Sequence, residues 1–203
     1  MERPIAKPIG SPVEDLDTPA LVVDITLLEQ NIEKVHSFFR DKDAKLRPHV
    51  ESHRCPTIAR KQMASTGTVN GISVNTVGEA EVFAQHGFDD ILVLNGVTTP
   101  QKIVRLCAIA KHTKITVAVD WPTNIQELST AAQQHKVILG CIVDIDTLQV
   151  RGGVAPGPPA VKLVKSIVSS SGLRFSGLMT YQGMMPADQQ DELVTQSNRS
   201  VQQ

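Results

Sequence analysis

The sequence alternates short runs of β-branched and apolar residues with longer segments in which apolar residues recur at helical spacing. Seven such runs occur, at residues 20–25, 45–49, 71–75, 91–94, 115–119, 137–143 and 174–179. The segments between them, at residues 27–39, 57–64, 78–85, 99–110, 123–134 and 159–170, are each long enough for a crossover helix. This alternation predicts βα units arranged around a parallel sheet.

Two further features refine the predicted fold. The strand segments are apolar throughout, as expected when both faces of a sheet are covered. Pro56, Pro100, Pro122 and Pro159 fall at or near predicted helix starts, where a missing N–H costs nothing. Because no glycine-rich nucleotide-binding motif follows the first strand, we favour an α/β fold of the TIM-like (β/α) barrel type over an open doubly wound sheet.

The strand count predicts that this barrel is incomplete. Residues 1–17 are proline-rich and aperiodic, which indicates an irregular N-terminal extension, and residues 18–203 form the predicted barrel domain. Seven strands are one short of a closed barrel, which typically takes about 250 residues. The polar, glutamine-rich end of the chain offers no eighth strand. Open barrel edges leave strands unpaired, so dimerisation, instability or truncation is expected.

Charge and composition exclude several classes of partner. Lys and Arg number 20 against 21 Asp and Glu, so the formal net charge of −1 gives no field that would recruit nucleic acid or an anionic membrane. No apolar run approaches the ~18–20 residues needed to span a bilayer, and the chain is expected to be cytoplasmic. Cys55, Cys107 and Cys141 are far apart and form no CxxC motif, which predicts buried thiols rather than disulfides or a zinc site.

Polar residues collect where the predicted strands end, which is where barrel enzymes place their active sites. The densest group is RPHVESHR at residues 47–54. If the strand persists, its period of two puts His49, Glu51 and His53 on one face, with Arg47 in line behind them. This pattern predicts either an acid/base group or a metal site of the two-His-one-carboxylate kind. A carboxylate that is neutralised by its basic neighbours is the alternative.

Later strand ends supply further candidates. Arg151 precedes two glycines and could surround an anion with its guanidinium and nearby backbone N–H groups, although a simple glycine turn also explains the run. Tyr181, the only tyrosine, could stack on a flat ligand or belong to the core. Glu79 and Glu81 open a predicted helix, and the helix dipole accounts for them structurally.

Five motifs occur in a defined order along the chain: TPALVVD at 18–24, RPHVESHR at 47–54, TVGEAEVFAQHGFDDILV at 76–93, DIDTLQVRGGVAPG at 144–157 and GLMTYQG at 177–183. This ordered set resembles the D-threonine aldolase and D-serine dehydratase family of pyridoxal-phosphate enzymes. The resemblance implies an alanine-racemase-like N-terminal barrel followed by a C-terminal β-domain, which is absent here. It also implies a cofactor across the barrel mouth, a small D-amino acid substrate and a homodimer.

The sequence departs from the family pattern at one chemically decisive position. The family usually reads RPHxKTHK, and its lysine forms the Schiff base with the cofactor. In this chain Glu51 stands at that position, and a carboxylate cannot form an imine. The family's phosphate-binding segment and its His and Cys metal ligands would lie beyond Gln203. A divalent metal is therefore not expected, and any bound pyridoxal phosphate would be held non-covalently.

The other family positions are matched more closely. Arg47, His49 and His53 stand where the pattern puts them. Arg151 and Tyr181 match the family's arginine after the sixth strand and the tyrosine of its Tyr-x-Gly-His motif, whose histidine is replaced by Met184. By resemblance, Glu51, His49 and His53 would be the catalytic residues, whereas Arg47, Arg151 and Tyr181 would contact the cofactor.

Three functional hypotheses follow. The first is an impaired pyridoxal-phosphate-dependent lyase that acts on small D-β-hydroxy amino acids, in which Glu51 serves at most as a base. The second is a divalent-metal-binding barrel that uses His49, Glu51 and His53. The third is a non-catalytic remnant or assembly subunit that pairs through its open edge. The sequence alone leaves open whether the chain is an enzyme.

Overall fold

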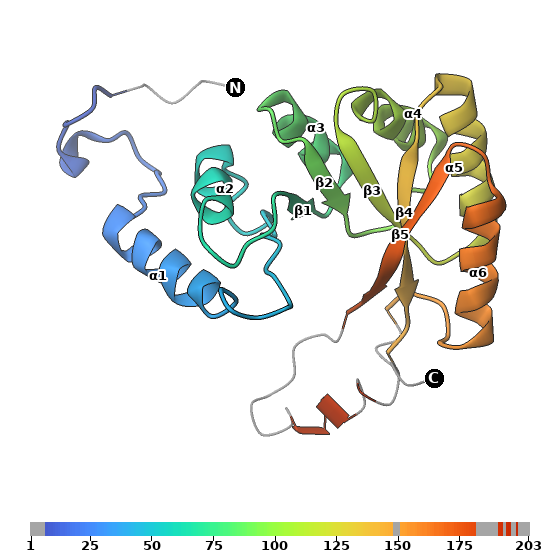
Figure 1. Ribbon diagram of the computed structural model, residues 1–203. Helices are drawn as coiled ribbons and strands as arrows, with labels where there is room; N and C mark the ends of the chain where they lie inside the picture. Colours follow the sequence, from blue (N-terminus) through green and yellow to red (C-terminus); the bar gives the residue numbers. More distant parts are fainter. Residues whose placement is uncertain (1–6, 148–150, 182–190, 193, 196–197, 199–203) are drawn as a thin grey trace.

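The fold is built on one parallel sheet whose strands follow one another in chain order (Figure 1). The computed structural model describes residues 7–147, 151–181, 191–192, 194–195 and 198. The five strands are β1 (Ile72–Val74), β2 (Asp90–Val93), β3 (Lys114–Val119), β4 (Leu139–Ile145) and β5 (Leu173–Thr180). Each strand pairs in parallel with the next, so all five carboxyl ends lie along the same edge of the sheet.

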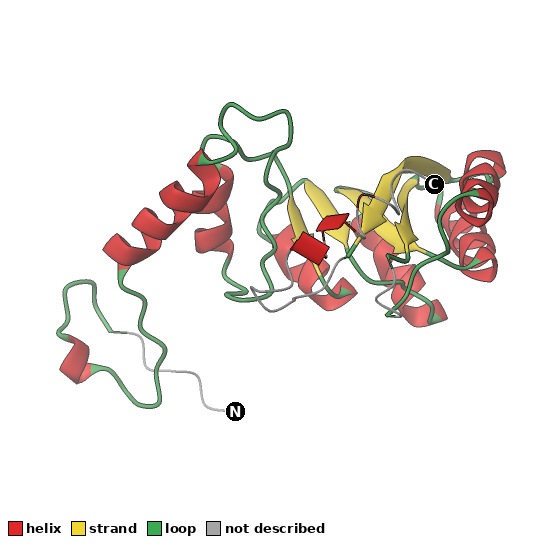
Figure 2. Ribbon diagram, turned by 90° about the horizontal axis from the view of Figure 1, so that it is seen from below, coloured by secondary structure: helices red, strands yellow, loops and turns green. Residues whose placement is uncertain are grey.

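Helices alternate with the strands, as the sequence predicts. After a 3₁₀ turn, η1 (Val13–Asp15), they are α1 (Ile25–Ser37), α2 (Pro56–Met63), α3 (Val77–Gln85), α4 (Pro100–Ile109), α5 (Pro122–His135) and α6 (Pro158–Ser169). Figure 2 shows α3 to α6 along one face of the sheet, with α1 and α2 off to its side. The opposite face, which we call the inner face, carries none of these six helices.

Local sequence signals explain where the helices begin. Pro56, Pro100 and Pro122 are the first residues of their helices, where proline's fixed φ suits the helical turn and its missing N–H is not needed. Helix α3 instead begins with a capping box, in which Thr76 accepts from the Glu79 amide and the Glu79 carboxylate accepts from the Thr76 amide. The structural role predicted for Glu79 is confirmed.

The core lies between the sheet and helices α3 to α6. It is built from the strand residues that point toward these helices, including Ile91, Val93, Ile115, Val117 and Leu139, all of which are buried. Strand β2 alternates between partly and fully buried residues, and β5 alternates between partly buried and exposed ones. The prediction that both faces of every strand are covered is therefore wrong for these strands, because in the described part of the chain only the helical side packs against an apolar layer.

The predicted fold class, a barrel-type α/β fold, is confirmed, but the barrel is open and two of the seven predicted strands do not form. Residues 20–24 are extended without strand pairing, and Leu21 is fully exposed. Asp24 instead caps α1, since its side chain accepts a hydrogen bond from the Leu27 amide at 3.0 Å. Residues 45–49 make only isolated bridges, from Leu46 to Thr68 and from His49 to Ser73. The end of the chain, for which no eighth strand was predicted, lies mostly outside the described residues.

The cysteines behave largely as predicted. Cys107 and Cys141 are buried free thiols, whereas Cys55 is only partly buried. Burial raises the pKa of the Cys141 thiol to about 12, so this group stays protonated and unreactive at neutral pH. Among the helices that the structure describes, none combines the length and apolar character that crossing a bilayer requires.

Because only one side of α6 packs on the core, truncation of two neighbouring side chains should change the stability by very different amounts. Ile167 is fully buried, and its neighbour Val168 is 69% exposed. Ile167→Ala should lower the free energy of unfolding by about 2–5 kcal/mol, because it removes buried methyl groups and leaves a cavity. Val168→Ala should change it by less than about 0.5 kcal/mol. Urea denaturation of both variants tests this, and equal effects would contradict the placement of α6 on the sheet.

Candidate functional site

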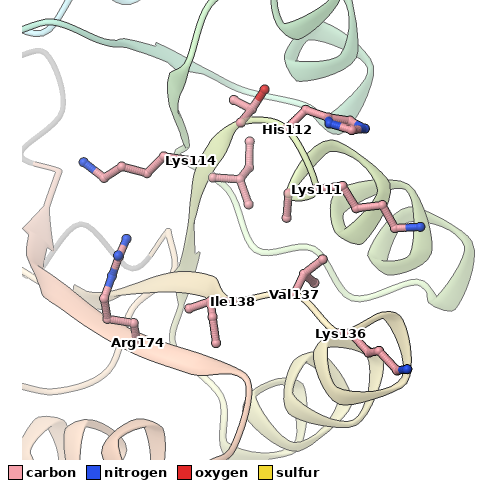
Figure 3. Close-up of a pocket in the computed structure, with 10 residues that line it drawn as sticks. Lys111, His112, Lys114, Lys136, Val137, Ile138 and Arg174 are labelled. Atoms are coloured by element: carbon pink, nitrogen blue, oxygen red, sulfur yellow. The ribbon is translucent and has the colours of Figure 1, made fainter.

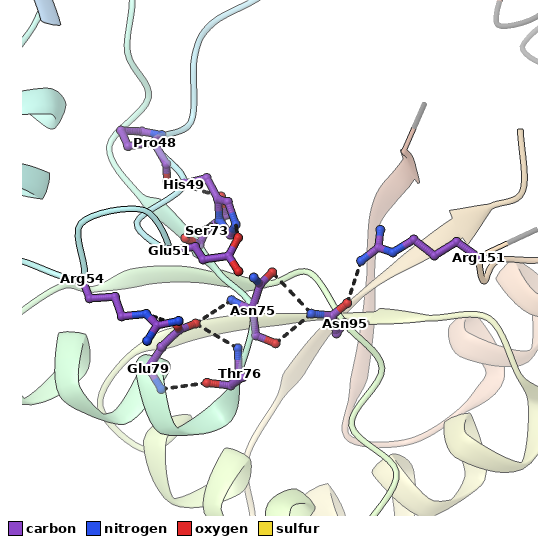
Figure 4. Close-up of polar contacts among 10 residues, drawn as sticks. All are labelled: Pro48, His49, Glu51, Arg54, Ser73, Asn75, Thr76, Glu79, Asn95 and Arg151. Carbon is purple, nitrogen blue, oxygen red and sulfur yellow. Dashed lines mark hydrogen bonds and ion pairs between the residues drawn. The ribbon is translucent and has the colours of Figure 1, made fainter. Parts of the chain in front are cut away.

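A histidine and a glutamate meet beside the carboxyl end of β1 (Figure 4). His49 is held by Ser73, since its Nδ1 lies 3.1 Å from the Ser73 carbonyl oxygen and 3.3 Å from the Ser73 hydroxyl. Its other nitrogen, Nε2, lies 3.3 Å from Glu51 Oε2. Ser73 is buried within β1, whereas the side chains of His49 and Glu51 are 35% and 49% exposed. The pair is therefore anchored on one side and open to a ligand on the other.

The tautomer of His49 sets the direction of these contacts. Nδ1 donates to the Ser73 carbonyl if it carries the hydrogen, and accepts from the Ser73 hydroxyl if it does not. In the second case Nε2 carries the hydrogen and donates it to Glu51 Oε2. In either arrangement an imidazole and a carboxylate, two groups that serve as acids and bases in enzymes, lie within hydrogen-bonding distance of each other.

The other residues of the 47–54 motif point elsewhere. His53 Nε2 lies 3.1 Å from Gln62 Oε1, and His53 Nδ1 accepts from the Cys55 amide at 3.0 Å. The prediction that His53 shares a face with His49 is wrong, because residues 51–53 form a turn closed by a hydrogen bond from Arg54 N to Val50 O. The period of two that the prediction assumed applies only to an extended chain.

Arg47 lies away from the carboxyl edge. Its Nη1 donates to Asp90 Oδ1 at 2.9 Å and to the Ile72 carbonyl at 3.3 Å. Asp90 is the first residue of β2 and Ile72 the first of β1, so the Arg47 guanidinium sits near the amino ends of these strands. The structure therefore separates Arg47 from the His49–Glu51 pair.

A chain of polar contacts runs along the edge from β1 toward β5. The Asn95 amide nitrogen donates to the Asn75 carbonyl at 3.0 Å, which turns the Asn95 side-chain oxygen toward Arg151. Arg151 Nη2 donates to that oxygen at 3.0 Å, and its guanidinium lies 4.5 Å from the centre of the Tyr181 ring. Figure 4 shows Asn95 between Asn75 and Arg151. Residues that follow β1, β2 and β5, and that are far apart in the sequence, thus hold the Arg151 guanidinium at this edge.

Carboxylates cluster at the ends of β3 and β4. Asp120 Oδ2 accepts from the Gly153 amide at 3.0 Å. Burial, together with the neighbouring charges of Asp120 and Asp146, raises the pKa of Asp144, although Arg151 opposes the shift. Gly153 has a φ of +99°, and a Cβ there would lie 2.6 Å from the Asp146 backbone nitrogen, so only glycine fits this close turn.

The structure brings together part of the predicted site. His49 and Glu51 form one group, and Arg151 and Tyr181 form a second on the same edge. Gly183 and Met184 lie outside the described residues. Sequence reasoning missed Ser73, whose only signal was a single hydroxyl within the otherwise apolar strand β1.

Comparisons with known proteins agree with this architecture. Residues 23–203 match the family described as alanine racemase, N-terminal domain. The chain is 36% identical over 177 residues to a 3-hydroxy-D-aspartate aldolase of Paracoccus denitrificans, which covers 87% of this chain and 46% of that protein. It is 34% identical over 180 residues to a D-threonine aldolase of Arthrobacter, which covers 89% of this chain and 47% of that protein.

A solved structure is also similar. The crystal structure of D-threonine aldolase from Filomicrobium marinum superposes with a TM-score of 0.91 at 34% identity, covering 100% of this chain and 55% of that one. The fold and the site at its carboxyl edge define a barrel-type α/β protein. The chain belongs to the alanine racemase N-terminal domain family. It spans about half the length of the curated relatives that it matches.

The residues at this edge fit a cofactor only in part. Arg151 offers a cation for an anionic group, and Tyr181 offers a flat ring. Within the described part of the chain, however, no lysine forms a hydrogen bond or ion pair with His49, Glu51 or Arg151. The described residues also contain no group of three His, Cys, Asp or Glu side chains placed to hold a metal ion. Among the described residues, this edge therefore presents a cation beside an aromatic ring, and no lysine amine contacts the His49–Glu51 pair.

The two hydrogen bonds of the Asn95 side chain, to Asn75 and to Arg151, predict that Asn95 positions Arg151. In Asn95→Ala, Arg151 should lose its fixed place over the Tyr181 ring, because its guanidinium loses its amide acceptor. NMR of the arginine side chain should then show that the upfield ring-current shift of the Arg151 protons is reduced. Asn70→Ala, which changes an exposed asparagine elsewhere, serves as the control. An unchanged Arg151 signal in Asn95→Ala would show that Asn95 does not hold it.

Proposed function

We propose that this chain carries the barrel portion of a pyridoxal-phosphate-dependent lyase acting on small D-β-hydroxy amino acids, and that Glu51 impairs it by preventing covalent capture of the cofactor. The observation that carries the proposal is the contact of 3.3 Å between His49 Nε2 and Glu51 Oε2 at the carboxyl edge of an alanine-racemase-type sheet. Barrel enzymes place their chemistry at this edge.

The named relatives support the substrate class. They are 3-hydroxy-D-aspartate and D-threonine aldolases and a D-threo-3-hydroxyaspartate dehydratase. Each name joins a D-amino acid with a hydroxyl group on the carbon next to Cα. Both reactions need an acid/base group at the β-hydroxyl. Cleavage of the C–C bond removes the hydroxyl proton, whereas dehydration adds a proton to the hydroxyl oxygen as it leaves.

The His49–Glu51 pair is suited to that step. The Glu51 carboxylate can accept a proton from a substrate hydroxyl, and the neighbouring His49 imidazole can take up or donate a proton in turn. Ser73 fixes the imidazole orientation, because its carbonyl and its hydroxyl both contact Nδ1 and leave Nε2 directed at Glu51. The half-exposed position of Glu51 lets a substrate reach the pair.

Arg151 and Tyr181 would hold the cofactor side of the site. A guanidinium stacked on a phenol ring, and restrained by Asn95, presents a fixed positive charge beside a flat surface. Pyridoxal phosphate, when bound, supplies the electron sink for bond cleavage at Cα. In this chain that ligand would be bound by charge and stacking alone, which lowers its affinity and its retention.

The substitution Glu51→Lys tests the proposal. It restores an amine at the position where the family pattern has a lysine, so incubation with pyridoxal phosphate followed by borohydride reduction should yield a stable adduct at residue 51. Mass spectrometry of the digested protein identifies the modified residue. The unmodified chain should give no adduct, and Glu127→Lys, which places a lysine on the exposed face of α5, should give none at residue 127.

Turnover is measured separately. With saturating pyridoxal phosphate and D-threonine or 3-hydroxy-D-aspartate, Glu51→Lys should release aldehyde or oxo acid faster than the unmodified chain does. If Glu51→Lys neither captures the cofactor nor gains turnover, the proposed lyase site is rejected.

A further inference from the structure

A hollow on the inner face of the sheet lies apart from the candidate site. Register places Leu92, Thr116, Gly140 and Arg174 side by side across β2 to β5. Two residues earlier on β2 and β3, and so on the same face, Asp90 lies beside Lys114. All of these residues except Gly140 line a cavity of about 440 Å³, together with Arg47, Ile142, Phe175 and Ser176.

Glycine at the centre of this row allows two side chains to come close to the backbone of β4. A Cβ at Gly140 would lie 2.6 Å from Thr116 Oγ1 and 2.9 Å from Ser176 Oγ. Two hydroxyl groups from neighbouring strands therefore converge over the bare backbone of β4. Ser176 Oγ makes only a long contact of 3.4 Å to the Arg174 carbonyl. Both hydroxyls can rotate to donate to a ligand between them.

Positive charges outnumber negative ones around the hollow. Both carboxylate oxygens of Asp90 already accept a hydrogen bond from a basic side chain, since Arg47 Nη1 donates to Oδ1 at 2.9 Å and Lys114 Nζ donates to Oδ2 at 2.5 Å. Burial opposes ionisation of Asp90, but these two hydrogen bonds prevail and lower its pKa, so it remains charged at neutral pH. The Arg174 guanidinium has no hydrogen bond or ion pair within the described part of the chain. Three cations thus face one carboxylate.

A second opening leads toward the same cations. A cavity of about 530 Å³ at the amino ends of β3 and β4 is lined by Lys114 and Arg174 and also by Lys111, His112 and Lys136 (Figure 3). Figure 3 shows Lys114 and Arg174 extending on the same side of the strands. Clustered basic side chains around a concave surface raise the local concentration of anions.

We propose that the hollow over Gly140 binds a small oxyanion, such as inorganic phosphate, between Arg174, Lys114 and the hydroxyls of Thr116 and Ser176. The guanidinium of Arg174 supplies paired N–H donors that match two oxygens of such an anion. The hydroxyls supply donors to the remaining oxygens. Gly140 lies four residues before Asp144, or about 13 Å along the strand, so this site is distinct from the carboxyl edge.

Phosphate titration of the 203-residue chain tests the proposal. Isothermal calorimetry with sodium phosphate, at an ionic strength held constant with sodium chloride, should show saturable binding of one anion per chain. Arg174→Gln should weaken this binding about tenfold or more, because it removes a charged hydrogen-bond donor. Ser176→Ala should weaken it by a smaller factor. Lys162→Gln, on the exposed surface of α6, should leave it unchanged.

Gly140→Ala provides an independent test of the location. The added methyl group occupies the space between the two hydroxyls, so phosphate binding should be lost while circular dichroism still shows the folded chain. Absence of saturable binding to the unmodified chain would overturn the proposal. Binding that survives both Arg174→Gln and Ser176→Ala would do the same, and these two exposed positions keep the test valid if Gly140→Ala does not fold.

Discussion

The burial of alternate strand residues beneath helices α3 to α6 determines which side chains of the sheet reach its inner face. Residues such as Ile91, Val117 and Val143 point into that apolar layer. Since side chains alternate along a strand, their neighbours must point to the inner face. The parallel pairing that accompanies this burial brings all strand carboxyl ends to one edge. One packing constraint therefore produces both the polar edge and the charged inner face.

The polar edge combines two small preorganised groups. His49 and Glu51 contact each other near β1, while Arg151 is fixed over Tyr181 near β5. Asn75 and Asn95 lie between these two groups. Asn95 donates to the Asn75 carbonyl and accepts from Arg151. The identity of residue 51 decides which chemistry this arrangement supports. A carboxylate there favours proton transfer with His49, whereas an amine would allow covalent binding of an aldehyde.

The sequence predicted the elements better than their contacts. Six helices and five strands follow from apolar periodicity and from prolines at helix starts, because these signals are local. The strand expected at residues 20–25 failed because Asp24 caps a helix and no neighbouring strand pairs with the segment in the described part of the chain. The grouping of His53 with His49 failed because a turn interrupts the extended chain. The link from Asn75 to Arg151 depends on residues far apart in sequence, and no local pattern encodes it.

The strictly sequential strand order has a consequence for biosynthesis. Each strand from β2 to β5 finds its pairing partner in the βα unit made just before it, so no pairing of the described sheet must wait for a distant segment to be translated. Contacts of short sequence separation also form quickly, since little loop entropy is lost in closing them. The sheet can therefore grow by templated addition on the ribosome, with the emerging strand extending an edge that is already in place.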